Sequence, residues 1–196
     1  MRRLLLLCAA ALALAASPVF AANPQVEFDT TAGTIRVELY PDAAPKTVEN
    51  FLKYVTSGHY TGTQFHRVIK GFMIQGGGYD GEYRQRPTRP PVAIESEQSV
   101  KAGLSNKPGT LAMARTSDPN SATGQFFINV ADNKRLDFRS PDPQGYGYTV
   151  FGKVIAGMDV AEKIAQSPTG AAGPFSSDVP AERVVIKSAR VVKPAG

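Results

Sequence analysis

The chain has 196 residues, of which 42% are hydrophobic and 20% charged, which is enough for one well-buried domain and too little for two. The formal net charge is +5, but the basic residues are scattered rather than clustered, which argues against nucleic acid as the main partner. The single cysteine, Cys8, lies in the N-terminal segment, so disulfides and cysteine catalysis are excluded for the rest of the chain.

The first 22 residues have the pattern of a secretory signal peptide. Two arginines follow Met1, an apolar stretch covers residues 4–16, and Val-Phe-Ala at 19–21 resembles a cleavage signal. The apolar stretch is shorter than the roughly 20 residues that a membrane span needs. We therefore predict cleavage after Ala21 or Ala22, a single domain over residues 23–196, and no membrane insertion of the mature chain.

Alternating apolar and polar residues follow the predicted signal peptide. They flank Gly33 over residues 26–33 and 34–40, which predicts a β-hairpin with one buried face. A helix is then expected to begin at Pro45, where the missing N–H of proline costs nothing, and to end at Gly58. The buried stripe expected on this helix consists of Val48, Phe51, Leu52 and Val55.

Short β-like runs occupy most of the remaining chain, and only one further helix, over residues 158–166, interrupts them. Many short strands with two helices indicate a closed barrel or a sandwich rather than an alternating βαβ sheet. Residues 79–106 and 137–146 resemble long surface loops. A binding role and a purely solvent-exposed loop are equally common interpretations of such segments. The expected strands cover residues 65–69, 71–75, 110–114, 126–130, 149–154 and 183–192.

The chain offers two histidines, which limits the chemistry it can perform. His59 follows Gly58 and is expected in a solvated turn, and His66 is expected to make a structural hydrogen bond rather than to act as a base. Two histidines without a cysteine provide no ligand set for a metal site. The glycines at 76–78 lack the ending of a phosphate-binding loop and are expected to form a tight turn. We therefore predict neither a metal nor a cofactor.

One permanently charged side chain, Arg67, is expected beside a group of apolar residues. A strand arginine is most often solvated or paired with an acid, but alternation places Phe65 and Ile69 on the face of Arg67. Two amides, those of Gln75 and Gln125, also lie in apolar runs. Three polar anchors near large apolar side chains describe a concave binding site. The large apolar residues concerned are Phe72, Met73, Phe126 and Phe127.

These runs resemble a known family. Phe-His-Arg and Gly-Phe-Met-Ile-Gln-Gly-Gly within 65–78, together with residues 109–114 and 124–130, resemble the cyclophilin-type peptidyl-prolyl cis-trans isomerases. With its signal peptide, the chain resembles the periplasmic cyclophilins of Gram-negative bacteria, and the similarity extends from Val26 to Val192. The resemblance implies a closed eight-stranded antiparallel barrel capped by two α-helices, in agreement with the strand and helix pattern. It also implies a periplasmic enzyme that rotates Xaa-Pro bonds in exported proteins. A monomer is expected, because the sequence shows no exposed-looking apolar helix.

The resemblance also implies the residues of the site. Arg67 would be the catalytic arginine that stabilises the twisted amide, and Phe72, Gln75 and Phe127 would act with it. In the family pattern, Phe72 and Phe127 line a proline pocket, and Gln75 holds the peptide. The further substrate-binding positions implied are Met73, Ala114, Arg115, Gln125, Arg135, Leu136 and Tyr148.

Three matched positions depart from the best-known eukaryotic pattern. Arg135 stands in place of a tryptophan, Arg115 in place of an asparagine, and Tyr148 in place of a histidine. Since that tryptophan contributes to cyclosporin binding in the family, weak cyclosporin binding is expected here. A second hypothesis is a binding module or holdase that binds proline-containing segments without catalysing their isomerisation. The presence of the whole catalytic set favours the isomerase.

Overall fold

The computed structural model describes residues 22–193, so the predicted signal peptide lies almost entirely outside the described residues. Eight antiparallel strands form one sheet in the order β10-β1-β2-β7-β5-β6-β4-β3. The strands are β1 (Gln25–Thr30), β2 (Gly33–Leu39), β3 (Arg67–Ile69), β4 (Met73–Gly76), β5 (Thr110–Met113), β6 (Phe126–Asn129), β7 (Val150–Ala156) and β10 (Ile186–Val192).

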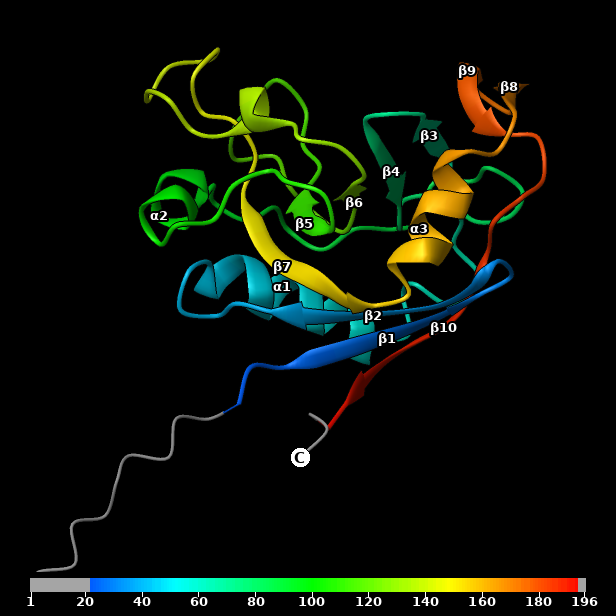
Figure 1. Cartoon of the computed structure of the whole chain (residues 1–196), viewed down its shortest axis with the longest axis horizontal. Coiled ribbons are helices and arrows are strands. Elements are labelled where there is room, and N and C mark those ends of the chain that lie inside the picture. Colours follow the sequence, from blue (N-terminus) through cyan, green and yellow to red (C-terminus); the bar gives the residue numbers. More distant parts are fainter. Residues whose placement is uncertain (1–21, 194–196) are drawn as a thin grey trace, which may run out of the picture.

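The sheet is strongly curled (Figure 1), and an antiparallel bridge between Gln64, before β3, and Val185, before β10, links its two edges. The amide of Phe65 donates to the carbonyl oxygen of Val184 at 2.9 Å, and the amide of Ile186 donates to that of Thr63 at 2.7 Å. These bonds satisfy backbone groups that an open sheet edge would leave exposed. The predicted eight-stranded antiparallel barrel is therefore confirmed.

Both predicted helices are present, as α1 (Pro45–Thr56) and α3 (Met158–Ala165). A third helix, α2 (Ser96–Lys101), lies within the segment predicted to be a loop, because six residues are too few to show a helical period. A 3₁₀ turn, η1 (Lys134–Leu136), follows β6. Among residues 22–193, no helix is long and apolar enough to cross a bilayer.

A separate β-hairpin, β8 (Thr169–Ala172) paired with β9 (Phe175–Pro180), was not predicted. The sequence of β8 is Thr-Gly-Ala-Ala and most of the strand is exposed, so it carries no alternation of buried and exposed residues. Figure 1 shows the hairpin beyond the end of α3, near β3. This position brings β9 close to the predicted site.

A side chain from a distant segment caps the first turn of α1. The carboxylate of Glu95 accepts hydrogen bonds from the amides of Lys46 at 3.1 Å and Thr47 at 2.8 Å, and from the Thr47 hydroxyl at 2.7 Å. These amides have no partner within the helix, and a negative charge is favoured at a helix N-terminus. Glu95 is 7% exposed, so it also ties the segment before α2 to α1.

The barrel interior is filled by aromatic and branched aliphatic side chains. The ring of Phe28 stacks on that of Phe126 at 5.3 Å between centroids, and Phe51 of α1 contacts Phe151 at 4.9 Å. Most of the predicted stripe of α1 is buried, but Leu52 is only partly buried. The residues of β2 predicted to point inward, Ile35, Val37 and Leu39, are all fully buried.

Alternation along β6 divides its residues between two apolar clusters. Phe126 and Ile128 belong to the main core, whereas Phe127 lies in a smaller cluster with Met73 of β4 and Ala112 of β5. This second cluster is the floor of the site described next. The two phenylalanines predicted together therefore have different surroundings.

Candidate functional site

A cavity of about 110 Å³ lies over the second cluster. All nine residues that line it were among the eleven predicted site residues, and their roles remain predictions. The other two, Gln125 and Arg135, contact lining residues. The lining residues are Arg67, Phe72, Met73, Gln75, Ala114, Arg115, Phe127, Leu136 and Tyr148.

Strand register explains why the central residues meet. In the antiparallel pairs β3–β4 and β4–β6, Arg67 is opposite Gln75, and Gln75 is opposite Phe127. Directly opposed residues point to the same face of a sheet. A cation, an amide and an aromatic ring therefore form one row across three strands, although Phe127 is far from Arg67 in the sequence.

The residues that share the strand face of Arg67 differ in one respect from the prediction. Phe65 was expected beside Arg67, but it is fully buried in the main core, 6.1 Å from the ring of Phe126. Residues 65 and 66 precede β3, so the strand alternation does not extend to them. Ile69 does pack against the cluster under the cavity.

The Arg67 guanidinium lies between an amide and a carboxylate. Its Nη1 donates a long hydrogen bond of 3.5 Å to Oε1 of Gln75, and its Nε lies 3.9 Å from Oδ2 of Asp178 on β9. The side chain of Arg67 is 43% exposed, so the charge is at the mouth of the cavity and open to an incoming ligand. No sequence pattern indicated Asp178, because the β8–β9 hairpin itself was not predicted.

A second amide supports the first. Nε2 of Gln75 donates to Oε1 of Gln125 at 3.0 Å. A Cβ on Gly78 would lie 2.4 Å from Cδ of Gln125, so a residue without a side chain is required there. The glycine run expected to form a turn thus also provides room for a site residue.

The floor and walls of the cavity are apolar. Met73 is 2% exposed and Phe127 4% exposed, and the Phe127 ring meets that of Tyr148 edge to face at 5.6 Å. Leu136 and Phe72 complete the wall. Such a hollow can hold a small apolar ring and exclude water around it.

Two further arginines stand at the rim of the cavity. The guanidinium carbon of Arg135 lies 4.8 Å from the centre of the Phe72 ring, and that of Arg115 lies 4.7 Å from the centre of the Tyr148 ring. Both distances are typical of cation–π contacts. Nε of Arg115 also donates to the carbonyl oxygen of Gly147 at 2.9 Å, which holds this arginine in place.

Buried asparagines, which were not predicted, hold the wall of the cavity. Nδ2 of Asn133 donates to the carbonyl oxygen of Phe72 at 2.8 Å and to Oδ1 of Asn129 at 2.7 Å. Asn129 in turn donates to Asn106, which donates to Asp137 at the end of η1. A polar residue such as Asn129 inside an apolar strand is the one sequence signal that could have indicated this network.

The two histidines take no part in the cavity lining. His66 is 2% exposed and packs between Tyr79 and Phe175, with ring centroids 4.7 and 5.4 Å away, and its Nδ1 has no partner. Burial lowers the pKa of His66 to about 4, so the ring is neutral at pH 7. His59 lies in a turn, as predicted, but it is half-buried rather than solvated, and its Nε2 lies 2.9 Å from the carbonyl oxygen of Gly77. Burial also lowers the pKa of His59.

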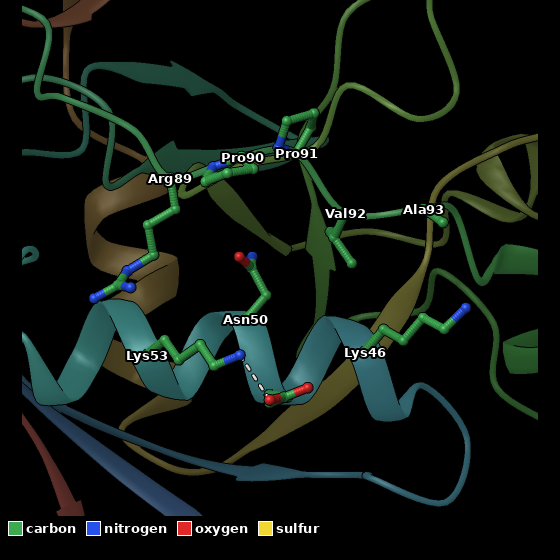
Figure 2. Close-up of a pocket in the computed structure, with 9 residues that line it drawn as sticks. Lys46, Asn50, Lys53, Arg89, Pro90, Pro91, Val92 and Ala93 are labelled. Carbon is green, nitrogen blue, oxygen red and sulfur yellow. Dashed lines mark ion pairs between the residues drawn. The ribbon is translucent and has the colours of Figure 1, made fainter.

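A wider hollow of about 430 Å³ lies elsewhere, between α1 and residues 89–93 (Figure 2). It is lined by exposed residues that include Lys46, Lys53 and Arg89, and Lys53 pairs with Glu49 at 2.6 Å. None of the predicted site residues lies in it. Its walls are mostly charged or proline side chains, so it lacks the apolar floor of the smaller cavity.

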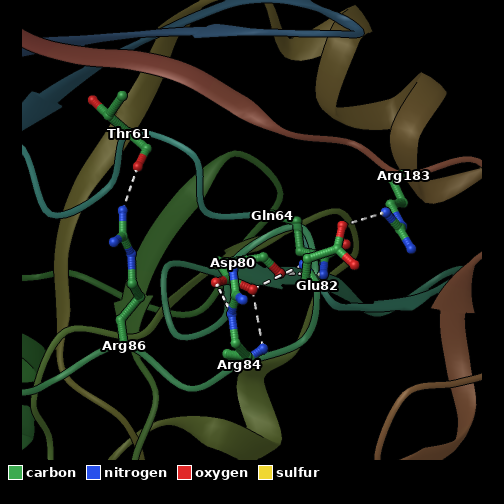
Figure 3. Close-up of polar contacts among 7 residues, drawn as sticks. All are labelled: Thr61, Gln64, Asp80, Glu82, Arg84, Arg86 and Arg183. Carbon is green, nitrogen blue, oxygen red and sulfur yellow. Dashed lines mark hydrogen bonds and ion pairs between the residues drawn. The ribbon is translucent and has the colours of Figure 1, made fainter.

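Polar contacts fix the first part of the predicted 79–106 loop (Figure 3). The Asp80 carboxylate accepts from the amides of Glu82 at 2.8 Å and Arg84 at 3.0 Å, and pairs with the Arg84 side chain at 2.9 Å. Arg86 reaches across to the carbonyl oxygen of Thr61 at 2.6 Å. The loop is therefore held in one arrangement. It lies beside a groove that is lined by Gln75 and Gln125.

Comparison with known proteins agrees with this geometry. Residues 25–191 match the model of the family described as cyclophilin type peptidyl-prolyl cis-trans isomerase/CLD. The chain is 50% identical to peptidyl-prolyl cis-trans isomerase A of Dickeya dadantii over 179 residues, which cover 90% of each protein. It is also 50% identical to peptidyl-prolyl cis-trans isomerase B of Escherichia coli over 166 residues, or 85% of this chain and 98% of that protein.

Solved structures show the same fold. A cyclophilin type peptidyl-prolyl cis-trans isomerase of Cryptosporidium parvum matches with a TM-score of 0.68 and 27% identity, covering 88% of this chain and 99% of that one. The structure of that protein in the presence of the dipeptide Ala-Pro matches with a TM-score of 0.66 at the same identity, covering 86% and 99%.

The fold is a cyclophilin-like barrel that carries a small cavity with an apolar floor. The chain belongs to the cyclophilin-type peptidyl-prolyl cis-trans isomerase family and is an enzyme of that activity. Within residues 22–193, no group of three or more His, Cys, Asp or Glu side chains could hold a metal ion.

Proposed function

We propose that the enzyme binds a proline ring in the 110 Å³ cavity and uses Arg67 to stabilise the amide midway through its rotation. The observation that carries this proposal is the row of Arg67, Gln75 and Phe127 across β3, β4 and β6. The related C. parvum enzyme has been solved in the presence of Ala-Pro, which supports a proline-containing ligand here.

The chemistry of the amide explains how a cation assists the rotation. The bond before proline rotates over a barrier because the nitrogen lone pair is delocalised into the carbonyl group, and twisting the bond localises that pair. A donor near the prolyl nitrogen then interacts better with the twisted state than with either planar isomer, which is the differential binding that catalysis requires. The Arg67 guanidinium carries a positive charge and offers several donors.

The magnitudes show that Arg67 cannot act alone. A barrier of about 19 kcal/mol gives a rate on the order of 0.1 per second, so a rate of about 10³ per second requires a reduction of about 5.4 kcal/mol. One charged hydrogen bond contributes about 1.5–3 kcal/mol. The remainder is assigned to the apolar cavity, which grips the ring and removes water that favours the planar amide.

The direct test is to measure kcat/KM on a Xaa-Pro peptide for Arg67→Ala. We expect a loss of at least about 100-fold, with folding retained because Arg67 is partly exposed. Arg89→Ala, which removes an equal charge from the separate hollow of Figure 2, is the matched control and should keep its activity. A loss below about threefold in Arg67→Ala would remove this residue from the mechanism.

We further propose that the enzyme is exported to the periplasm and assists the folding of exported proteins there. The support is the signal-like sequence of residues 1–22, and the N-terminal sequence of protein purified from the periplasmic fraction tests it. A mature N-terminus at residue 22 or 23 agrees with the proposal. Uncleaved protein found only in the cytoplasm contradicts it.

Two finer properties are also proposed. The chain should be a monomer, which light scattering of the purified protein measures. Cyclosporin should inhibit weakly, because Arg135 occupies the rim position over Phe72. The holdase alternative predicts binding of proline peptides without exchange between isomers, so NMR exchange spectroscopy on one peptide separates the two functions.

A further inference from the structure

A second groove opens from one edge of the proline cavity. Its volume is about 590 Å³, and it shares Arg115, Leu136 and Tyr148 with the cavity. Because these residues line both spaces, a peptide seated in the cavity can continue directly into the groove. One extended residue spans about 3.3–3.6 Å, so the groove is within reach of residues adjoining the proline.

The groove carries two positive charges and no negative one. Arg115 and Arg135 both line it, and none of its other lining residues is charged. Within residues 22–193, the Arg135 guanidinium has no hydrogen bond or ion pair, and its contact is with the face of the Phe72 ring. A planar guanidinium stacked on a ring keeps its edge donors free for a carboxylate.

Another edge of the cavity carries less charge. There a groove of about 340 Å³ shares Gln75, Ala114 and Arg115 with the cavity and is lined mainly by amides and hydroxyl groups. Its one charged lining residue is Arg115. Nε of this arginine is bound by the carbonyl oxygen of Gly147, and its Nη1 donates to that of Thr116 at 2.8 Å. Since Arg115 lines both grooves, the two edges of the proline cavity differ by the charge of Arg135.

We propose that the groove containing Arg115 and Arg135 is a subsite for an acidic side chain close to the proline, on one side of it only. The substrates favoured by this enzyme are then Xaa-Pro segments with Asp or Glu within two residues of proline. This inference rests on the proposed use of the cavity for proline. Arg135 is the specificity-determining residue, because its charge has no other partner.

The expected preference is moderate. Arg135 is exposed, so water and salt screen its charge, and a single exposed ion pair changes affinity by less than about tenfold. The contact of Arg135 with the face of the Phe72 ring reduces the cost of ordering the side chain. We therefore expect kcat/KM to be between about threefold and tenfold higher for Glu than for Gln at the preferred position.

The experiment measures kcat/KM by NMR exchange on peptides that differ at one position. Glu, Gln or Lys is placed one or two residues after proline, or two residues before it, in about 50 mM salt. The proposal predicts the order Glu, Gln, Lys on one side of the proline, with a smaller difference in about 500 mM salt. Equal rates for the three peptides at every position, or the same preference on both sides, would overturn it.

Variants connect the preference to the groove. Arg135→Gln should bring the Glu to Gln ratio close to one, and Arg135→Glu should reverse the order so that the Lys peptide is fastest. Arg89→Glu makes the same change in net charge in the separate hollow of Figure 2 and should keep the wild-type ratio. A ratio that survives in Arg135→Gln, or is lost equally in Arg89→Glu, contradicts the assignment to this groove.

The same data separate the two levels of the proposal. If the wild-type enzyme accelerates the Gln peptide but ignores the charge, only the acidic subsite is refuted. If Arg67→Ala accelerates every peptide as fast as the wild type, the proposed function of the cavity fails as well.

Discussion

His66 should make the stability of the protein fall in mildly acidic solution. The ring is 2% exposed, and its burial lowers the pKa to about 4 from a usual value of 6.5. The positive charge of Arg67 acts in the same direction, while hydrogen bonding with the Gln64 backbone and the Gln125 side chain partly offsets the shift. The perturbation we propose is His66→Phe, which keeps an aromatic ring between Tyr79 and Phe175 but binds no proton.

The sign and size of the change in the free energy of unfolding follow from proton linkage. Between pH 6.5 and pH 4 the unfolded chain binds a proton at His66 and the folded chain does not, so lowering the pH favours unfolding. One pKa unit corresponds to about 1.36 kcal/mol. Between pH 7.5 and pH 5.0 the linkage relation gives a loss of about 2 kcal/mol in the free energy of unfolding. Below that range, carboxylates such as Glu27, whose pKa is lowered by hydrogen bonding with Arg36, also contribute.

The assay is urea unfolding at constant ionic strength between pH 5.0 and 7.5. The wild type should lose about 2 kcal/mol towards pH 5.0, and His66→Phe should show a flatter dependence. His59 has a lowered pKa for the same reason and contributes in the same direction, so His59→Gln and the double variant complete the set. Parallel curves for wild type and His66→Phe, or an imidazole pKa of about 6 or higher by NMR, would refute the reasoning.

Three other predictions concern groups that support the fold and the site. Glu95→Gln should lower the free energy of unfolding by about 1–2 kcal/mol, because it weakens the cap of α1. Glu97→Gln, on the exposed face of α2, should change the free energy of unfolding by less than about 0.5 kcal/mol in the same urea assay. Asn133→Ala should lower stability by about 1–3 kcal/mol and raise KM, since the wall of the cavity loses its support; an unchanged KM would mean that the network is purely structural. Asp178→Asn keeps a residue that tolerates the positive φ of 66° but removes the ion pair with Arg67, so kcat/KM should fall by less than about fivefold. Asp29→Asn, which removes an exposed pair far from the cavity, is its control, and equal effects of the two would remove Asp178 from the site.

The local pattern of the sequence was sufficient for most of the barrel strands, but not for the β8–β9 hairpin. Alternation in short apolar runs predicted a barrel or a sandwich, and the resemblance to the family selected the barrel and implied that Arg67, Gln75 and Phe127 share one site. A strand arginine in an apolar run is locally unusual, which is why it could be recognised. Pro45 and the apolar spacing after it predicted α1 with the correct first residue.

The sequence by itself thus determined most of the barrel strands, because alternation depends on neighbours within a few residues, and its family motifs implied which side chains serve the site. Only the tertiary structure decided what those side chains contact. Phe65 turned into the core because β3 begins two residues later, and Asp178 reached Arg67 through a hairpin with no periodic signal. The asparagine network and the unpaired charge of Arg135 likewise depend on contacts between distant segments, which local periodicity does not encode.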